Sequence, residues 1–135
     1  MAEPSGLRIV AIHNAMKGAK NTDEEWVQID NAGSEKWTVH NWELTDETEQ
    51  QLRPHIYRFP ETLGNGGTWT FDPGETIYVF TGHGQDVFIA EPSNQGRPQF
   101  HFYWNRDAMV WNNSGDRVYL RSDDGRFVTL PFPIP

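Results

Sequence analysis

Hydrophobic residues recur along the chain in short runs, and no segment sustains an apolar period of 3.6 residues. β-branched and aromatic residues fill these runs, while Gly, Pro, Asn and Asp separate them. This pattern is typical of an antiparallel β-sandwich or barrel. The stretch 84–99 has weak strand character and predicts a long surface loop. The expected strands lie at 7–13, 25–33, 37–46, 55–60, 67–72, 75–82, 100–104, 117–122 and 127–130.

Two local patterns predict departures from straight strands. In DPGET, Pro73 presets φ and Gly74 accepts a positive φ, which predicts a type II turn. In WTVHNWEL the apolar positions step by three residues, which one face of a period-two strand cannot accommodate. We therefore expect a β-bulge near His40 and Asn41.

The last hairpin can form in two registers around its Asp-Gly turn. A two-residue loop at 124–125 would pair Leu120 with Thr129 and divide the apolar residues between both faces. A three-residue loop pairs Leu120 with Val128 and keeps the apolar residues on one face. We predict the three-residue loop, with Gly125 at a positive φ.

Length and composition limit the possible classes of protein. The 135 residues predict a single domain, 1–135, with a core at about 7–130 and a short proline-rich tail at 131–135. Cysteine is absent, which excludes disulfides and thiolate metal sites. No signal-peptide pattern and no apolar run of membrane-helix length is present. We expect a cytoplasmic protein, or a secreted one if the sequence is a trimmed or excised piece.

The net charge of −8 disfavours nucleic acid as a partner, because such binding draws most of its affinity from Lys and Arg. The 11 basic residues are scattered among 19 acidic ones without a basic run. The segment 43–51, ELTDETEQQ, contains four acids and no base. An acidic segment of this kind favours a basic partner by electrostatic steering.

Five short motifs follow one another along the chain: EWVQIDNAG (25–33), VHNWELTD (39–46), YRFP (57–60), FDPGETIYVFTG (71–82), and VWNNSGDRVYL (110–120) with DDGRFV (123–128). In this order they resemble the motifs of the lamin-tail domain family, as found alone or as an accessory module in bacteria and archaea. The resemblance spans about residues 7–130. The chain has Asn41 where the family has a glycine, and its loop at 84–99 is longer.

The resemblance implies an immunoglobulin-like β-sandwich and a mostly non-catalytic module that binds proteins through loops or edges. It supplies no catalytic residue to carry over. It also implies that prokaryotic members accompany hydrolases or nucleases as accessory domains.

Catalytic and metal-binding patterns are weak in this sequence. The five histidines have no spacing that directs two imidazoles at one metal, and the Asp-Gly cluster lacks the oxygens of a calcium loop. His83 and Asp86 in TGHGQD form the one acid–base candidate, but a solvated loop histidine is the commoner case. We predict no catalytic residue, no metal and no cofactor.

Exposed aromatic residues are the stronger binding candidates. Val27 and Ile29 face inward in their strand, which leaves Trp26 outward. Phe100, Phe102 and Trp104 face the core, which leaves His101 and Tyr103 outward, while Trp37 opens a strand at a turn. Trp and Tyr dominate the hot spots of protein interfaces. The predicted binding residues are Trp26, Trp37, His101 and Tyr103.

These observations favour a non-enzymatic domain that binds a protein partner, or a second copy of itself, through exposed aromatics or a sheet edge. A carbohydrate-binding module is an alternative and predicts coplanar exposed rings beside Asn, Gln or Asp. An accessory domain of a hydrolase or nuclease system is another, and a catalytic version predicts His83 near carboxylates in a pocket.

Overall fold

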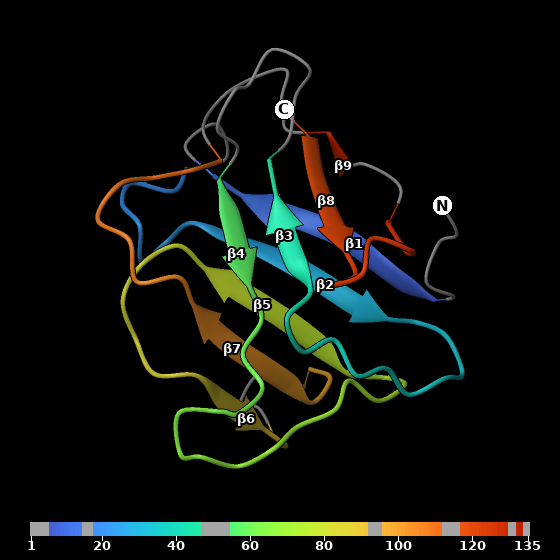
Figure 1. The fold of residues 1–135 in the computed structure, drawn as a ribbon. Coiled ribbons are helices and arrows are strands. Elements are labelled where there is room, and N and C mark those ends of the chain that lie inside the picture. Colours follow the sequence, from blue (N-terminus) through green and yellow to red (C-terminus); the bar gives the residue numbers. More distant parts are fainter. Residues whose placement is uncertain are drawn as a thin grey trace.

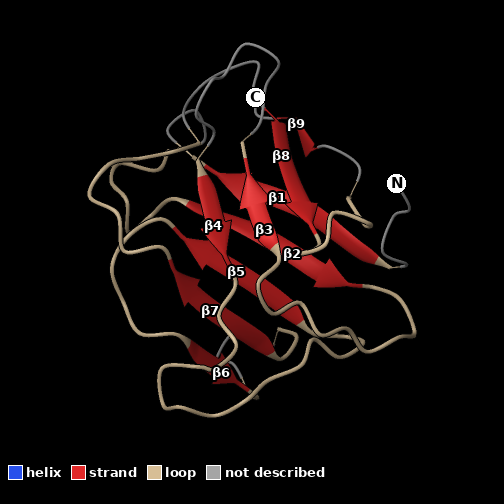
Figure 2. Ribbon diagram, viewed as in Figure 1, coloured by secondary structure: helices blue, strands red, loops and turns tan. Residues whose placement is uncertain are grey.

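The computed structural model describes residues 6–14, 18–46, 55–91, 96–111, 117–129 and 132–133. In these ranges the chain forms strands, turns and loops without a helix (Figure 2). Two β-sheets pack face to face (Figure 1). The all-β sandwich predicted from the short apolar runs and the turn residues between them is confirmed.

The larger sheet has five strands in the order β1-β2-β5-β7-β6. The parallel pairing of β5 with β7 is the exception in a sheet that is otherwise antiparallel. A parallel pair needs a crossover connection, and here the crossover contains β6. β6 lies inside the stretch predicted as a loop, so that part of the prediction was wrong. The strands are β1 (Leu7–His13), β2 (Trp26–Asn31), β5 (Thr76–Phe80), β7 (Gln99–Tyr103) and β6 (Val87–Ile89).

The smaller sheet has four short strands in the order β4-β3-β8-β9, all antiparallel. Its last strand lies within the predicted proline-rich tail, where Phe132 pairs with Val118. In the described part of the predicted strand 127–130, residues 127–129, Val128 forms an isolated bridge with Arg121. The strands are β4 (Ile56–Arg58), β3 (Glu43–Thr45), β8 (Arg117–Arg121) and β9 (Phe132–Pro133).

The core lies between the two sheets and is formed by alternate residues of each strand. Every second side chain of a strand points to the same face, so one face supplies the core. The buried residues follow this rule in both sheets. They include Val27, Ile29, Ile77, Val79, Phe100 and Phe102 from the larger sheet, and Leu44, Val118 and Leu120 from the smaller one.

The expected bulge near His40 and Asn41 is a turn instead. The Trp42 N–H donates to the Val39 carbonyl at 3.1 Å, and Asn41 has a φ of 65°. Asparagine tolerates this left-handed region better than most residues, which explains why it can replace the family's glycine. The turn ends the predicted strand 37–46, of which only β3 and a bridge at Trp37 remain.

The Asp-Gly hairpin has the register that we rejected from the sequence. Gly125 has a φ of 75°, as predicted, but Leu120 faces Thr129 rather than Val128. The Leu120 N–H donates to the Thr129 hydroxyl at 3.0 Å. This register packs the Phe127 ring against Trp42 and Trp37. The aliphatic residues alone favour the other register, and the aromatic contacts of Phe127 outweigh them.

The type II turn at DPGET is present as predicted. Gly74 has a φ of 86°, and the Glu75 N–H donates to the Asp72 carbonyl at 3.2 Å. This turn places Glu75 directly before β5, where it borders a pocket described below.

Candidate functional site

Five aromatic side chains gather on the outer face of the larger sheet, opposite the core. They come from β2, β5 and β7, and strand register brings them together: Phe80 pairs with both Trp26 and Tyr103, and Tyr78 pairs with His101. Each is half-buried, while its strand neighbours Val27, Ile29, Ile77, Val79 and Phe102 are buried in the core. We call Trp26, Tyr78, Phe80, His101 and Tyr103 the aromatic face.

The rings of the aromatic face contact one another in a continuous row. The Phe80 and Tyr103 rings stack with their centroids 5.2 Å apart and their planes 17° apart. His101 lies against both Phe80 and Tyr78, at 5.2 and 5.6 Å. Trp26 meets Tyr78 edge-on at 5.4 Å. The five side chains therefore form one surface and restrain one another's rotamers.

The loop between β5 and β6 holds one end of the aromatic face in place. Asp86 accepts the Tyr103 backbone N–H at 2.9 Å. Gly84 lies so close to the Tyr103 ring that a Cβ on it would stand 2.6 Å from the ring carbons. No larger residue than glycine fits at position 84 without displacing Tyr103.

Carboxylates lie near both tyrosines of the aromatic face. Burial raises the pKa of Tyr103, and the negative charges of Asp86 and Asp23 raise it further. Burial also raises the pKa of Tyr78, with a contribution from Asp30. Both hydroxyls therefore remain protonated hydrogen-bond donors at neutral pH.

The carboxylates differ in whether a cation neutralises them. Arg97 donates to Asp30 Oδ2 at 2.8 Å and also to the carbonyls of Asn31 and Gly74. Asp86 instead accepts a backbone N–H. The negative charge of Asp86 thus acts on Tyr103, whereas that of Asp30 is paired with Arg97.

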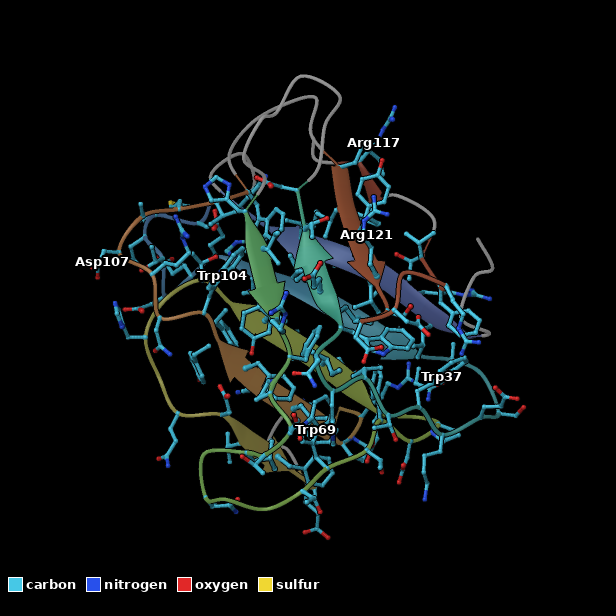
Figure 3. All side chains as sticks on the ribbon, in the orientation of Figure 1. Trp37, Trp69, Trp104, Asp107, Arg117 and Arg121 are labelled. Carbon is cyan, nitrogen blue, oxygen red and sulfur yellow. The ribbon has the colours of Figure 1, made fainter. Side chains whose placement is uncertain are left out.

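The structure brings together three of the four predicted binding residues. Trp26, His101 and Tyr103 belong to the aromatic face. Trp37 does not, because it packs edge-on against Trp42 and Phe127 at 5.8 Å each. Figure 3 shows Trp37 on the opposite side of the view from Trp104 and Asp107.

Tyr78 and Phe80 were not predicted as binding residues. Their signal is the alternation in TIYVF, where Ile77 and Val79 face inward and leave the two rings outward.

The predicted acidic segment does not act as an exposed cluster where the structure describes it. Glu43 pairs with Arg58. Asp46 is fully buried and accepts from the backbone N–H of His55 at 2.6 Å, while its other oxygen lies 2.7 Å from His55 Nδ1. Residues 47–51 lie outside the described residues. The carboxylates that could attract a basic partner are therefore those beside the aromatic face, Asp23 and Asp86.

The acid–base candidate His83 lies 2.7 Å from Asp107 rather than beside Asp86. Both side chains are exposed, 58% and 96%, which does not shield a proton transfer from water. Among the described residues no group of three or more His, Asp or Glu could hold a metal ion. In the same part of the chain, no helix has the length and apolarity to span a membrane.

Burial lowers the pKa of His101, and this makes a testable prediction. The folded state disfavours the protonated imidazole, so it binds fewer protons than the unfolded state below a pH of about 6.5. We expect the unfolding free energy to lose the His101 contribution as the pH falls from about 6.5 toward the lower folded-state pKa. NMR titration of the His101 ring should give a pKa below about 6.5, the ordinary value for histidine. A His101 pKa at or above that ordinary value would contradict the packing described here.

The family comparison agrees with the fold. A model of the lamin tail domain matches residues 3–130, nearly the whole chain. No curated protein matches the chain. The immunoglobulin-like sandwich of that family corresponds to the two sheets observed here. The chain therefore belongs to the lamin tail domain family.

Proposed function

We propose that this domain binds a basic protein partner through the aromatic face. Membership of the lamin tail domain family suggests an immunoglobulin-like interaction domain, and the family is generally non-catalytic. The single observation that carries the proposal is the row of five contacting rings on the outer side of a sheet whose core face is already filled.

The aromatic residues on this face fit the energetics of protein recognition. A sandwich needs one apolar face on each sheet, and the larger sheet has aromatic residues on its second face as well. Trp and Tyr are enriched among interface hot spots, where truncation to alanine costs about 2 kcal/mol or more of binding free energy. Because the rings hold one another in place, little side-chain entropy is lost on binding.

The surrounding charges favour a basic partner. Asp23 and Asp86 act on Tyr103, while Arg97 is engaged by Asp30 and two carbonyls. The net charge of −8 adds a general attraction for cationic surfaces. We expect this attraction to raise the association rate more than the affinity, and to weaken with salt.

The arrangement of the rings favours a protein over a sugar. Carbohydrate platforms present coplanar ring faces to the ligand. Here the Trp26 and His101 planes each stand at 87° to the Tyr78 plane, so the five rings do not form one flat platform. The polar hydroxyls of the tyrosines remain available at the edges.

Affinity capture from cells of the source organism tests the proposal. The baits are the wild-type domain, the double variant Trp26→Ala/Tyr103→Ala, and Tyr119→Ala as a control. Tyr119 is a half-buried tyrosine on β8, in the other sheet. We expect a set of basic proteins that the wild type and the control retain, and that the double variant loses at least tenfold.

If the double variant retains the same basic proteins as the wild type, the proposal is contradicted. Ring-dependent binding on a glycan array would also contradict it, and would assign the surface to carbohydrate. Matching thermal unfolding of the three baits, within a few degrees, is required so that a lost partner reports the surface rather than the fold.

A further inference from the structure

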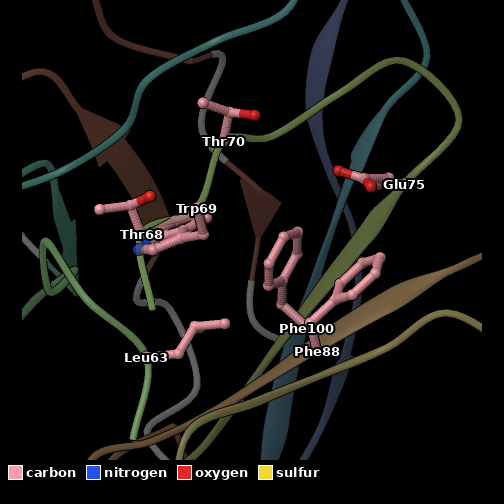
Figure 4. Close-up of a pocket in the computed structure, with 7 residues that line it drawn as sticks. All are labelled: Leu63, Thr68, Trp69, Thr70, Glu75, Phe88 and Phe100. Atoms are coloured by element: carbon pink, nitrogen blue, oxygen red, sulfur yellow. The ribbon is translucent and has the colours of Figure 1, made fainter. Parts of the chain in front are cut away.

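A second feature lies on the other side of β7, at the end of the sandwich next to the edge strand β6. It is an open pocket of about 280 Å³, just below the range of about 300 to 1,000 Å³ that is usual for sites of drug-sized ligands. Its size suits one small group rather than a polymer. Figure 4 shows the apolar walls, which are Leu63, Trp69, Phe88 and Phe100.

One carboxylate lines this apolar pocket. Glu75 Oε1 accepts the Asp72 N–H at 2.7 Å, and Oε2 has no partner among the described residues. Burial raises the pKa of Glu75. The hydrogen bond from the Asp72 N–H opposes this rise, and the negative charge of Asp72 adds to it. A carboxylate so placed gains by pairing with a cation that the pocket does not contain.

Two threonine hydroxyls line the same pocket as Glu75. The Thr70 hydroxyl donates to Asp72 Oδ1 at 2.8 Å, which leaves its lone pairs able to accept a hydrogen bond. Thr68 also borders the pocket. Carboxylate and hydroxyl oxygens above aromatic walls form an environment for a positively charged group on an apolar stem.

We propose that this pocket binds a primary alkylammonium group, as carried by a lysine side chain or a small amine. The ammonium donates to Glu75 Oε2 and to the Thr70 hydroxyl, and the alkyl stem packs against Trp69, Phe88 and Phe100. Aromatic rings also attract a cation through their electron-rich faces. This site is separate from the aromatic face, because Phe88 and Phe100 point inward and His101 points outward.

The geometry selects ammonium over the other cations. A guanidinium prefers both oxygens of a carboxylate, and Oε1 of Glu75 already accepts a backbone N–H. A divalent metal prefers several oxygen ligands and no aromatic wall. An ammonium is a compact donor that one free carboxylate oxygen can hold.

NMR titration of the wild-type domain with n-butylammonium chloride tests the proposal, with n-butanol as the neutral probe of similar shape. We expect saturable shifts at the Asp72 and Glu75 amides and at the Trp69 indole with butylammonium, and at least tenfold weaker binding of butanol. Trp69 Nε1 donates to the Pro60 carbonyl, so its signal reports the pocket wall.

Two variants isolate the charge. Glu75→Gln keeps an oxygen that accepts the Asp72 N–H, so we expect the fold to be retained and butylammonium binding to weaken at least tenfold. Glu35→Gln removes an exposed carboxylate outside the pocket lining and should change binding less than twofold. Equal binding of butanol and butylammonium by the wild type would overturn the proposal, as would unchanged binding by Glu75→Gln.

The source of the ammonium is distinguished in the same assay. If Nα-acetyl-lysine methylamide binds more tightly than butylammonium, the pocket prefers a lysine side chain. If butylammonium binds more tightly, the pocket prefers a free amine. Both results support the ammonium site. Binding by the Nε-acetylated lysine derivative as tight as by the free one would contradict it.

Discussion

Replacing Glu25 with alanine is expected to lower the free energy of unfolding by about 3 to 5 kcal/mol. The Glu25 carboxylate is fully buried, and it accepts from the Thr81 hydroxyl at 2.6 Å, the Val110 N–H at 2.8 Å and the Trp111 N–H at 3.3 Å. Without it these three buried donors lose their acceptor, and each costs about 1 to 3 kcal/mol. Because single domains are stable by only about 5 to 15 kcal/mol, chemical denaturation will detect the loss easily.

Two matched variants define what the Glu25 experiment measures. Glu25→Gln keeps one carbonyl oxygen but turns an NH₂ group toward N–H donors, so its cost should approach that of alanine. Glu24→Gln changes the adjacent acid, which is half-buried and contacts His13 through its backbone carbonyl. This variant should lower the free energy of unfolding by less than about 0.5 kcal/mol, as is usual for surface changes. Similar losses for Glu24→Gln and Glu25→Ala would show that Glu25 has no special role.

The second large effect concerns the two faces of the larger sheet. Phe102→Ala should cost about 3 to 5 kcal/mol, since this ring is fully buried and packs against Trp69 at 4.8 Å and Phe59 at 5.5 Å. Phe80→Ala is the same chemical change on the neighbouring strand, but on the opposite face. Because the Phe80 ring is only half-buried, its removal should lower the free energy of unfolding by less than half as much.

Chemical denaturation of both phenylalanine variants provides the comparison. A small cost for Phe80 means that fold stability alone does not explain the aromatic face, which is what a binding surface requires. Equal costs for the two variants would mean that the aromatic face is a second core, and the proposed function would lose its support.

Short apolar runs separated by turn residues were enough to predict the sandwich, and period-two alternation predicted its inward residues and three of the five rings of the aromatic face. It works for β2 and β7 because each strand has one fully buried face, so parity at Val27 or Phe102 determines where Trp26 or Tyr103 points. The same parity places Glu25 inward beside Val27. An acidic residue at an inward position of a strand indicates a buried, hydrogen-bonded carboxylate.

Other features depend on contacts between distant segments. β6 has only three residues, and all are partly exposed, so no alternation of buried and exposed positions indicates it in the sequence. Its pairing with β7 places Phe88 in the wall of the pocket. Arg97 reaches across 67 residues to Asp30, which no spacing in the sequence indicates. The hairpin register depended on where Phe127 could pack, and that required the positions of Trp37 and Trp42.

Hydroxyl-radical footprinting of the domain, free and bound to a partner recovered with the wild-type bait, tests most directly whether the aromatic face is the binding surface. In the free domain we expect modification of Trp26, Tyr78 and Tyr103, and little modification of the fully buried Trp111. Binding should protect Trp26, Tyr78 and Tyr103 severalfold and leave Trp37 and Tyr119 unchanged. Protection of Trp37 or Tyr119 with unchanged modification of Trp26 and Tyr103 would contradict the proposed binding surface.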